Sequence, residues 1–306
     1  MTVNMQLPEG VAFLERGWLS SNNVLLHDEE QAVLIDTGYW THAKQTEELI
    51  RSVIGRQPLD LIINTHLHSD HCGGNAHLQL AYPNVKTRTP PGHFEYVAQW
   101  NPDALTYTPT GQHCPQFNAE TYLQAGEMFE VAGLEWRVHS APGHDPHSII
   151  LFCEASGILI SADALWEKGF GVVFPEIEGT SAFEEVGATL NLIEKLQPRI
   201  VLPGHGAAFT DVTKAIAYAR LRLEGFSVAP LKHALYAAKV LLKFKLLELQ
   251  SVELDDFYDW ADNCSYFHQL HTHFKDDTFA KWTQDMCESL VKSGAAMQID
   301  NKLINC

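Results

Sequence analysis

The sequence predicts a layered α/β domain followed by a helical C-terminal part, and two observations support this fold class. Strand and helix signals alternate over the first two hundred residues, which is typical of sheets covered by helices. From about residue 211 onward, helical segments follow one another. We therefore expect one domain over residues 1–210 and a helical domain over residues 211–306.

Short apolar runs mark the expected strands, and segments with helical periodicity mark the expected helices. Strands are predicted at residues 23–26, 32–35, 61–63, 135–138, 149–152, 158–160 and 200–202. Helices are predicted at residues 41–54, 75–81, 183–196, 215–223, 231–249, 255–260 and 277–292. Residues 99–126 are rich in Pro, Thr, Asn and Gln and show little periodicity, so we expect a binding loop or lid there.

The composition favours a cytoplasmic globular protein. Of the 306 residues 45% are hydrophobic, which is enough to bury a core. The six cysteines have long, irregular spacings and no CxxC pair, so we expect free thiols rather than a disulfide framework. The first residues lack the basic and apolar regions of a secretory signal. Lysines interrupt the apolar stretch at residues 228–247, which makes it a poor membrane span.

The charge distribution disfavours nucleic acid as a partner. The formal net charge is −17, and residues 1–210 carry 25 of the 38 acidic residues but only 10 of the 21 basic ones. A nucleic-acid-binding surface needs a concentration of positive charge, which this sequence does not show. We expect a small-molecule substrate instead.

The segment at residues 65–71, Thr-His-Leu-His-Ser-Asp-His, concentrates metal-binding side chains after a buried strand. Alternate positions of an extended segment point the same way, so His66 and His68 can share one metal ion. Asp70 and His71 follow where a helix begins and can face a second ion. Imidazole and carboxylate groups suit zinc, manganese or iron. Solvated loop histidines are the alternative, and this spacing of four ligands disfavours it.

This motif resembles that of the metallo-β-lactamase superfamily, and four further segments extend the resemblance over about residues 10–208. Each stands beside a strand signal and follows the order of the family: Leu-Ile-Asp-Thr-Gly at 34–38, Ala-Pro-Gly-His at 141–144, Ser-Ala-Asp at 161–163 and Leu-Pro-Gly-His-Gly at 202–206. The resemblance implies a four-layer αβ/βα sandwich as the catalytic domain, with a C-terminal helical extension.

The resemblance also implies two divalent metal ions, zinc in the first place and manganese or iron as alternatives, held by seven side chains. These are His66, His68 and His144 for the first ion, Asp70, His71 and His205 for the second, and Asp163 as a bridge between them. Asp36 would orient a ligand histidine by a hydrogen bond to its ring. The alternative is that Asp36 is an aspartate of an ordinary turn.

Such a ligand set predicts a hydrolase. Metal binding can lower the pKa of water from 15.7 to about 7, so a bridging hydroxide exists at neutral pH. It would attack a carbonyl carbon or a phosphorus while the ions stabilise the oxyanion. Asp70 would be the catalytic residue that orients the hydroxide and shuttles its proton. We expect a small ester, thioester or lactone as the substrate.

Differences from the ligand residues of other branches of the family reduce the number of functions to consider. The true β-lactamases carry cysteine or serine where Asp163 stands, so the aspartate favours the branch of glyoxalase II, lactonases and nucleases. Flavodiiron proteins have an acidic residue in place of His68. The alternatives are a phosphodiesterase or endoribonuclease, a mononuclear iron dioxygenase, and a non-hydrolytic metal-binding sensor.

The C-terminal helices loosely resemble the winged-helix-like end of β-lactamase-like endoribonucleases. Arg220 and Arg222 on the first helix could face an anionic substrate or be solvated. The apolar helices could also form a homodimer interface.

Other residues have a functional and a structural interpretation. Cys72 is a candidate ligand or a small buried thiol, and His147 lies near the metal motif or has a structural role. Residues 166–174 are the candidate apolar wall for a substrate. We expect a solvated or interface role for three clustered histidines, His268, His271 and His273.

Overall fold

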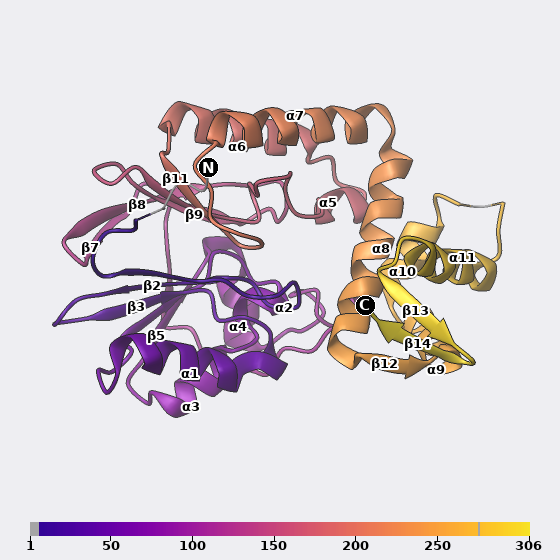
Figure 1. The fold of residues 1–306 in the computed structure, drawn as a ribbon, viewed down its shortest axis with the longest axis horizontal. Helices are drawn as coiled ribbons and strands as arrows, with labels where there is room; N and C mark the ends of the chain where they lie inside the picture. Colours follow the sequence, from indigo (N-terminus) through magenta and orange to yellow (C-terminus); the bar gives the residue numbers. More distant parts are fainter. Residues whose placement is uncertain (1–5, 275) are drawn as a thin grey trace.

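The computed structural model describes residues 6–274 and 276–306, and Figure 1 shows two sheets packed face to face with helices outside them. The first sheet has the order β1-β2-β3-β4-β5-β6 and the second β11-β10-β9-β8-β7. Helices α1 (Ala43–Ile54) and α3 (Asn75–Ala81) cover the first sheet. Helices α6 (Phe183–Leu196) and α7 (Val212–Val228) cover the second. The predicted four-layer sandwich is thus confirmed.

The strands of the two sheets are short and mostly buried. The first sheet contains β1 (Val11–Leu14), β2 (Asn23–His27), β3 (Ala32–Ile35), β4 (Leu61–Ile63), β5 (Lys86–Thr89) and β6 (Thr121–Tyr122). The second contains β7 (Met128–Val131), β8 (Leu134–Ser140), β9 (Ile149–Cys153), β10 (Ile158–Ala162) and β11 (Ile200–Pro203). Every residue of β3, β9 and β10 is buried, because each sheet is covered on both faces and continuous apolar runs fit such strands.

Parallel pairing places the ends of several strands at one edge. Strands β3, β4 and β5 pair in parallel in the first sheet, and β10 and β11 pair in parallel in the second. The carboxyl ends of parallel strands meet at the same edge of a sheet, where open α/β sheets place their ligands. All the predicted ligands except His144, which comes after β8, lie just beyond the ends of β4, β10 and β11.

The C-terminal part contains helices with a core of their own and a small sheet that the sequence analysis did not predict. The helices are α8 (Pro230–Leu249), α9 (Leu254–Asp262), α10 (Ser265–His271) and α11 (Phe279–Lys292). The sheet has the order β12-β14-β13, formed by β12 (Ser251–Glu253), β13 (Ala296–Ile299) and β14 (Lys302–Asn305). Its strands are short and half exposed, so they lack the apolar runs that mark strands in the sandwich.

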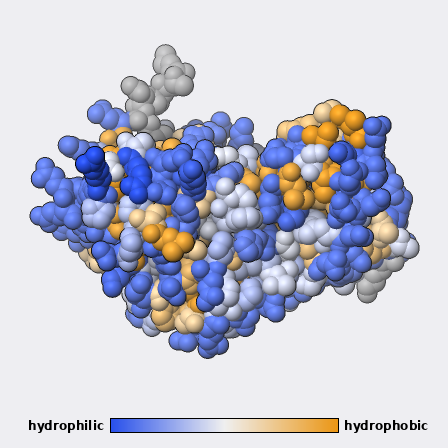
Figure 2. Space-filling view, turned by 90° about the horizontal axis from the view of Figure 1, so that it is seen from below, coloured by the Kyte–Doolittle hydropathy of each residue, from blue (hydrophilic) through white to orange (hydrophobic). Residues whose placement is uncertain are grey.

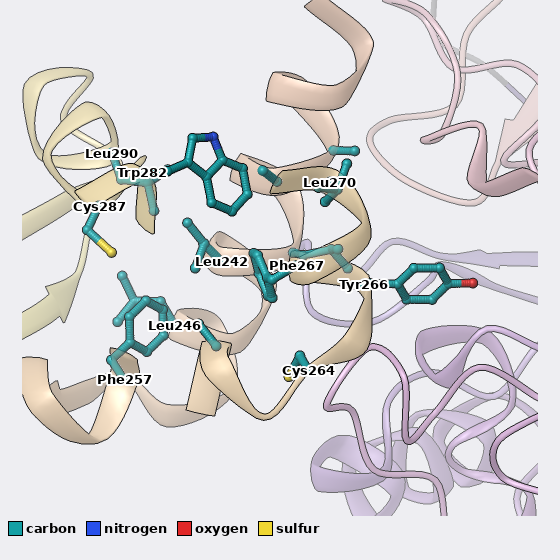
Figure 3. Packing of buried hydrophobic residues seen from close by; sticks show 14 of the residues in the cluster. Leu242, Leu246, Phe257, Cys264, Tyr266, Phe267, Leu270, Trp282, Cys287 and Leu290 are labelled. Carbon is teal, nitrogen blue, oxygen red and sulfur yellow. The ribbon is translucent and has the colours of Figure 1, made fainter. Parts of the chain in front are cut away.

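Large apolar side chains hold the C-terminal part together (Figure 3). Leu242 and Leu246 of α8 lie beside Phe257, Phe267 and Trp282, all of them buried. The figure shows the Tyr266 ring pointing out of this cluster toward the sandwich, where its hydroxyl donates a hydrogen bond to Glu178. Tyr266 therefore links the cluster directly to the sandwich.

Helices α7 and α8 connect the two parts. Helix α7 packs on α6 and shares its core through Val212, Ile216 and Ala219. Helix α8 stands between the sandwich and the C-terminal part in Figure 1. The domain boundary after residue 210 and the winged-helix-like character of the last part stay predictions.

The surface is mainly hydrophilic when the molecule is seen from below Figure 1 (Figure 2). A hydrophobic patch lies over the C-terminal part in this view. Whether such a surface forms a homodimer interface stays a prediction. None of the helices that the structure describes combines the length and the apolar character needed to cross a bilayer.

Candidate metal centre

The histidine-rich motif forms a loop and one helical turn after β4. Helix α2 (Ser69–Cys72) carries Asp70 and His71, as the sequence predicts, while His68 before it is extended with a ψ of 149°. Thr65 fixes the start of this loop. Its backbone N–H and its hydroxyl both donate to the Asp36 carboxylate, over 2.8 and 2.7 Å. The motif is therefore held to the end of β3 before it reaches the site.

The three remaining predicted ligands lie on loops after other strands. His144 follows β8, Asp163 follows β10 and His205 follows β11. The two loops after β10 and β11 approach closely at Gly204, where an added Cβ would touch Oδ1 of Asp163. Only glycine lets the backbone pass the carboxylate at this distance, which explains the glycine before the last histidine.

The structure brings all seven predicted ligands together. Three overlapping groups have donor atoms within 4.8 Å of one another: His66, His68 and His144; His66, His71 and Asp163; and Asp70, His71 and His205. The first and third groups match the two ligand sets implied by the resemblance. The middle group takes one member from each set and adds Asp163, the predicted bridge. Each of these groups could hold a metal ion.

Hydrogen bonds aim the lone pairs of two histidines into the site. Nδ1 of His144 donates to the carbonyl oxygen of Val172 over 2.5 Å, and Nδ1 of His71 donates to Asp36 over 2.7 Å. A neutral imidazole that donates through Nδ1 has its lone pair at Nε2. Nε2 of His144 lies 3.2 Å from Nε2 of His66, and the buried Nε2 of His71 has no hydrogen-bond partner among the described residues. Nitrogen atoms placed in this way fit metal ligands.

The electrostatics of the site also fit divalent cations. Burial, reinforced by neighbouring imidazoles, holds the pKa values of His66 and His68 well below their usual value, so both rings are neutral. Burial alone would raise the pKa of Asp163, but the imidazoles of His205 and His71 outweigh it and lower that pKa, so the carboxylate stays charged. Neutral imidazole and ionised carboxylate are the forms that bind zinc and related ions.

His71 differs from the other histidines. Burial would lower its pKa, but the carboxylates of Asp36, Asp163 and Asp70 outweigh burial and raise the pKa well above its usual value. Without a cation, a proton neutralises part of this negative charge. A metal ion that binds at Nε2 must displace that proton.

A cavity of about 120 Å³ opens onto the site. Asp70 reaches it with 14% of its side chain exposed. Trp166 and Phe174 line it, as expected for the predicted apolar wall, whereas Phe170 of the same segment is buried in the core under α6. Two other parts of the lining were not predicted: the exposed Trp18, and the α8 side chains Tyr236, Val240, Leu241 and Phe244.

The other candidate residues have structural contacts. Sγ of Cys72 lies 3.1 Å from the Tyr107 hydroxyl and 3.8 Å from Sγ of Cys114, and it belongs to none of the three donor groups. The Arg220 guanidinium pairs with Glu194 at 2.6 Å, and that of Arg222 lies 4.2 Å from the centre of the Tyr236 ring. Cys72 is therefore a buried thiol, and Arg220 is engaged on the surface.

The remaining histidines lie away from the donors. The ring of His147 contacts that of His93, with 4.6 Å between the ring centres. His268 and His271 pack against Phe279, and the His273 side chain is exposed. None of them belongs to a group of donor atoms in the part of the chain that the structure describes.

Comparison with known proteins agrees with this geometry. Residues 16–205 match the family model described as the metallo-β-lactamase superfamily. An atrochrysone carboxyl ACP thioesterase from Aspergillus aculeatus is 24% identical over 204 residues, which are 64% of this chain and 54% of the relative. A hydroxyacylglutathione hydrolase from Francisella tularensis is 28% identical over 167 residues, 52% of this chain and 55% of the relative. The chain thus spans about half the length of these relatives.

Solved structures share the fold. A metallo-β-lactamase family protein from Thermus thermophilus matches with a TM-score of 0.58 and 20% identity, covering 98% of this chain and 100% of that one. The family match covers strands β2 to β11 of the sandwich and all seven predicted ligands. The chain therefore belongs to the metallo-β-lactamase superfamily.

Proposed function

We propose that this chain is a dinuclear metal-dependent hydrolase that acts on a small ester, thioester or lactone. The donor geometry supports the proposal, because Asp163 lies within reach of donors from both ligand sets. Its Oδ1 is 3.4 Å from Nε2 of His71, and its Oδ2 is 3.4 Å from Nε2 of His144. One carboxylate between two sets of imidazoles is the arrangement that a pair of ions needs.

Two divalent ions bound here would supply a nucleophilic water at neutral pH and polarise the carbonyl oxygen of the substrate. The protein side chains do the rest. Asp70 Oδ2 lies 3.1 Å from Nε2 of His205, and the carboxylate faces the cavity, where it can take up a proton from the attacking water. Trp18 and Trp166 flank His205, and their rings contact its imidazole.

The surroundings of the site favour a carbonyl substrate over a phosphodiester. No lysine or arginine is among the described residues that line the cavity. Apart from the proposed ions, the described lining therefore offers no lysine or arginine to bind the charge of a phosphodiester, and the net charge of −17 adds repulsion. The names of two relatives, a carboxyl ACP thioesterase and a hydroxyacylglutathione hydrolase, point to thioester chemistry. We therefore propose a thioester or ester before an RNA or DNA substrate.

We further propose a cytoplasmic enzyme with a catalytic domain over residues 1–210 and a helical domain over residues 211–306. All six cysteines are free thiols, and five of them are buried. Free thiols persist in reducing compartments, which supports the location. Cell fractionation with a tagged full-length chain would test it.

The proposed function is tested by metal analysis and a substrate panel on the same preparation. We expect about two zinc ions per chain, and hydrolysis of thioesters, esters or lactones that a chelator abolishes and zinc restores. Phosphodiesters and β-lactams complete the panel. A single iron with oxygen consumption, or phosphodiester cleavage that exceeds thioester hydrolysis in kcat/KM, would contradict the proposal.

A further inference from the structure

A second cavity of about 430 Å³ adjoins the metal site. It shares four lining residues with the first cavity: Trp18, Tyr236, Val240 and Phe244. Because the same side chains line both, the two cavities lie next to each other along α8, and the first of them reaches the metal donors. We refer to the two together as the depression. The first cavity, of about 120 Å³, is small for a substrate, whereas the second has the size usual for small-molecule pockets.

The wall of the second cavity is one stripe of helix α8. Tyr236, Val240, Phe244 and Leu247 follow one another at intervals of four, four and three residues, which places them on one face. The stripe is about 16 Å long, at a rise of 1.5 Å per residue. The opposite face of the helix, with Ala238, Leu242 and Leu246, is buried in the C-terminal core. The stripe is therefore rigid and preformed.

The lining is apolar although two lysines belong to it. The ammonium group of Lys243 donates three hydrogen bonds, to the carbonyl oxygen of Ala295 and to Oδ1 of Asn305, both over 2.6 Å, and to the carbonyl oxygen of Cys306, a further lining residue, over 2.9 Å, so its charge is engaged by the C-terminal segment. Its methylene groups are left to face the cavity beside Phe244 and Leu247. Lys239 is the other charged residue of the lining.

Trp18 lies where the two cavities join, and its surface is incompletely covered. Its side chain is 57% exposed, although its ring stacks on that of His205, with 5.2 Å between centres and 6° between planes. The edge of Trp166 adds a contact at 5.4 Å. A large aromatic ring fixed in this way and still open to solvent marks a surface that an apolar ligand covers.

We propose that this depression binds the acyl group of the substrate, a medium-length aliphatic chain or an aromatic group of similar size, with the carbonyl at the metal donors. This inference rests on the proposed function for the position of the carbonyl. The thiol half of natural thioesters is rich in amide groups, which would lose their hydrogen bonds against Val240, Phe244 and Leu247. The acyl group is the half that suits this lining.

A series of N-acetylcysteamine thioesters with acetyl, butanoyl, hexanoyl and octanoyl groups tests the proposal, because the leaving group stays constant. With the zinc-loaded protein we expect kcat/KM to rise about fourfold for each added methylene until the cavity is filled. Leu247→Trp, which fills the far end, should lower the octanoyl-to-acetyl ratio of kcat/KM at least tenfold. Leu247→Ala, which enlarges it, should favour longer chains.

Leu249→Trp is the matched control. Leu249 lies in the last turn of the same helix, is 40% exposed and is outside the lining, so its replacement should leave the ratio unchanged. Equal kcat/KM for all four thioesters, or equal ratios in Leu247→Trp and Leu249→Trp, would overturn the proposal while leaving the hydrolase intact.

Binding without turnover separates this inference from the proposed function. Octanoate should bind the chelator-treated full-length protein at least tenfold more tightly than butanoate, and should change the fluorescence of Trp18. The comparison of wild type with Trp18→Leu isolates that signal. Chain-length-dependent binding without hydrolysis of any thioester, ester or lactone would refute the hydrolase and keep the acyl site. Equal affinity for octanoate and butanoate would refute the acyl site.

Discussion

Asp36 accepts a hydrogen bond, 2.7 Å long, from Nδ1 of His71. The same carboxylate also accepts the backbone N–H and the hydroxyl of Thr65, so it joins the end of β3 to both ends of the histidine-rich motif. Its backbone has a φ of +59°, a conformation that asparagine and aspartate tolerate better than other side chains. Asp36 therefore fixes the orientation and the tautomer of His71.

We predict that Asp36→Asn weakens zinc binding about 10- to 100-fold, because the amide loses the charge that supports His71 while keeping the backbone conformation. Competition with a chromogenic chelator measures the affinity. Asp60→Asn is the matched control, since Asp60 also accepts a backbone N–H, that of Ala32, but at the edge of the sheet away from the site. Unchanged zinc affinity in Asp36→Asn would contradict this role.

A second prediction concerns His66, which belongs to two of the donor groups, and Asp163, the proposed bridge between the ions. His66→Ala and Asp163→Ala should each lower the rate of hydrolysis at least about a thousandfold. His66 belongs to two of the three donor groups, and Asp163 belongs to the group that takes one member from each ligand set. The zinc content should fall below two per chain. His77→Ala is the control. His77 lies on α3, its side chain is 38% exposed, and its Nε2 pairs with the Glu47 carboxylate. Full turnover in both site variants would refute the ligand assignment.

The loop at residues 101–119 depends on the C-terminal part. Nε1 of Trp260 donates to the carbonyl oxygen of Gly111, and the backbone N–H of Tyr266 donates to that of Pro109, both over 3.2 Å. Thr110 and Gln112 of this loop line the metal cavity. An alanine at position 111 would bring its Cβ against Sγ of Cys264 and Nε1 of Trp260.

We predict that Gly111→Ala lowers the free energy of unfolding by about 2–4 kcal/mol and raises KM, because it combines backbone strain with a clash. Gly133→Ala separates the two effects. Gly133 has a φ of +64° against +63° for Gly111, but has open space around it, so about 1 kcal/mol is expected. Urea unfolding and steady-state kinetics measure both. Equal losses in the two variants would show that the clash does not exist.

His233 of α8 gives the protein a stability that depends on pH. Its Nε2 accepts the backbone N–H of Val173 over 3.0 Å, and burial, with a smaller effect of Arg222, lowers its pKa to about 4. An unfolded histidine has a pKa of about 6.5, so between pH 6.5 and 4 the unfolded state binds more protons. The contribution of His233 is therefore complete above pH 6.5 and is lost as the pH falls toward 4.

We predict that His233 accounts for about 2 kcal/mol of the stability lost between pH 7.5 and pH 5. His233→Gln keeps an acceptor for the Val173 N–H but does not titrate. Between pH 7.5 and pH 5 the free energy of unfolding of this variant should fall by about 2 kcal/mol less than that of the wild type. Urea unfolding at the two pH values measures the difference. Parallel losses in wild type and variant would mean that His233 is already solvated in the native state.

The sequence predicted the sandwich well where local signals are strong. Residues 75–81 and 183–196 form α3 and α6 with the expected bounds, because turn residues and periodicity agree there. Strands β5 and β6 were not predicted, since β5 reads Lys-Thr-Arg-Thr and β6 has two exposed residues. Such segments become strands because their backbones pair with a neighbouring strand, and the sequence of the segment itself does not show that this neighbour is present.

The donor residues could be predicted from the sequence, whereas most of the cavity lining could not. The seven donors were predicted because each stands in a short motif beside a strand end. Trp18 and the α8 stripe were not, because their place depends on how a distant helix docks against the sandwich. Helix α8 is apolar on two faces, and its sequence does not tell which face meets the core and which meets the cavity.

In the proposed enzyme, the sandwich would carry out the reaction and helix α8 would select the substrate. The donors lie on loops of the sandwich, whereas the far wall belongs to a helix rooted in a different core. If the proposed acyl site is correct, substitutions along that helix change substrate preference and leave the donors intact. On this view, homologues could evolve different substrate specificities through changes in this one helix.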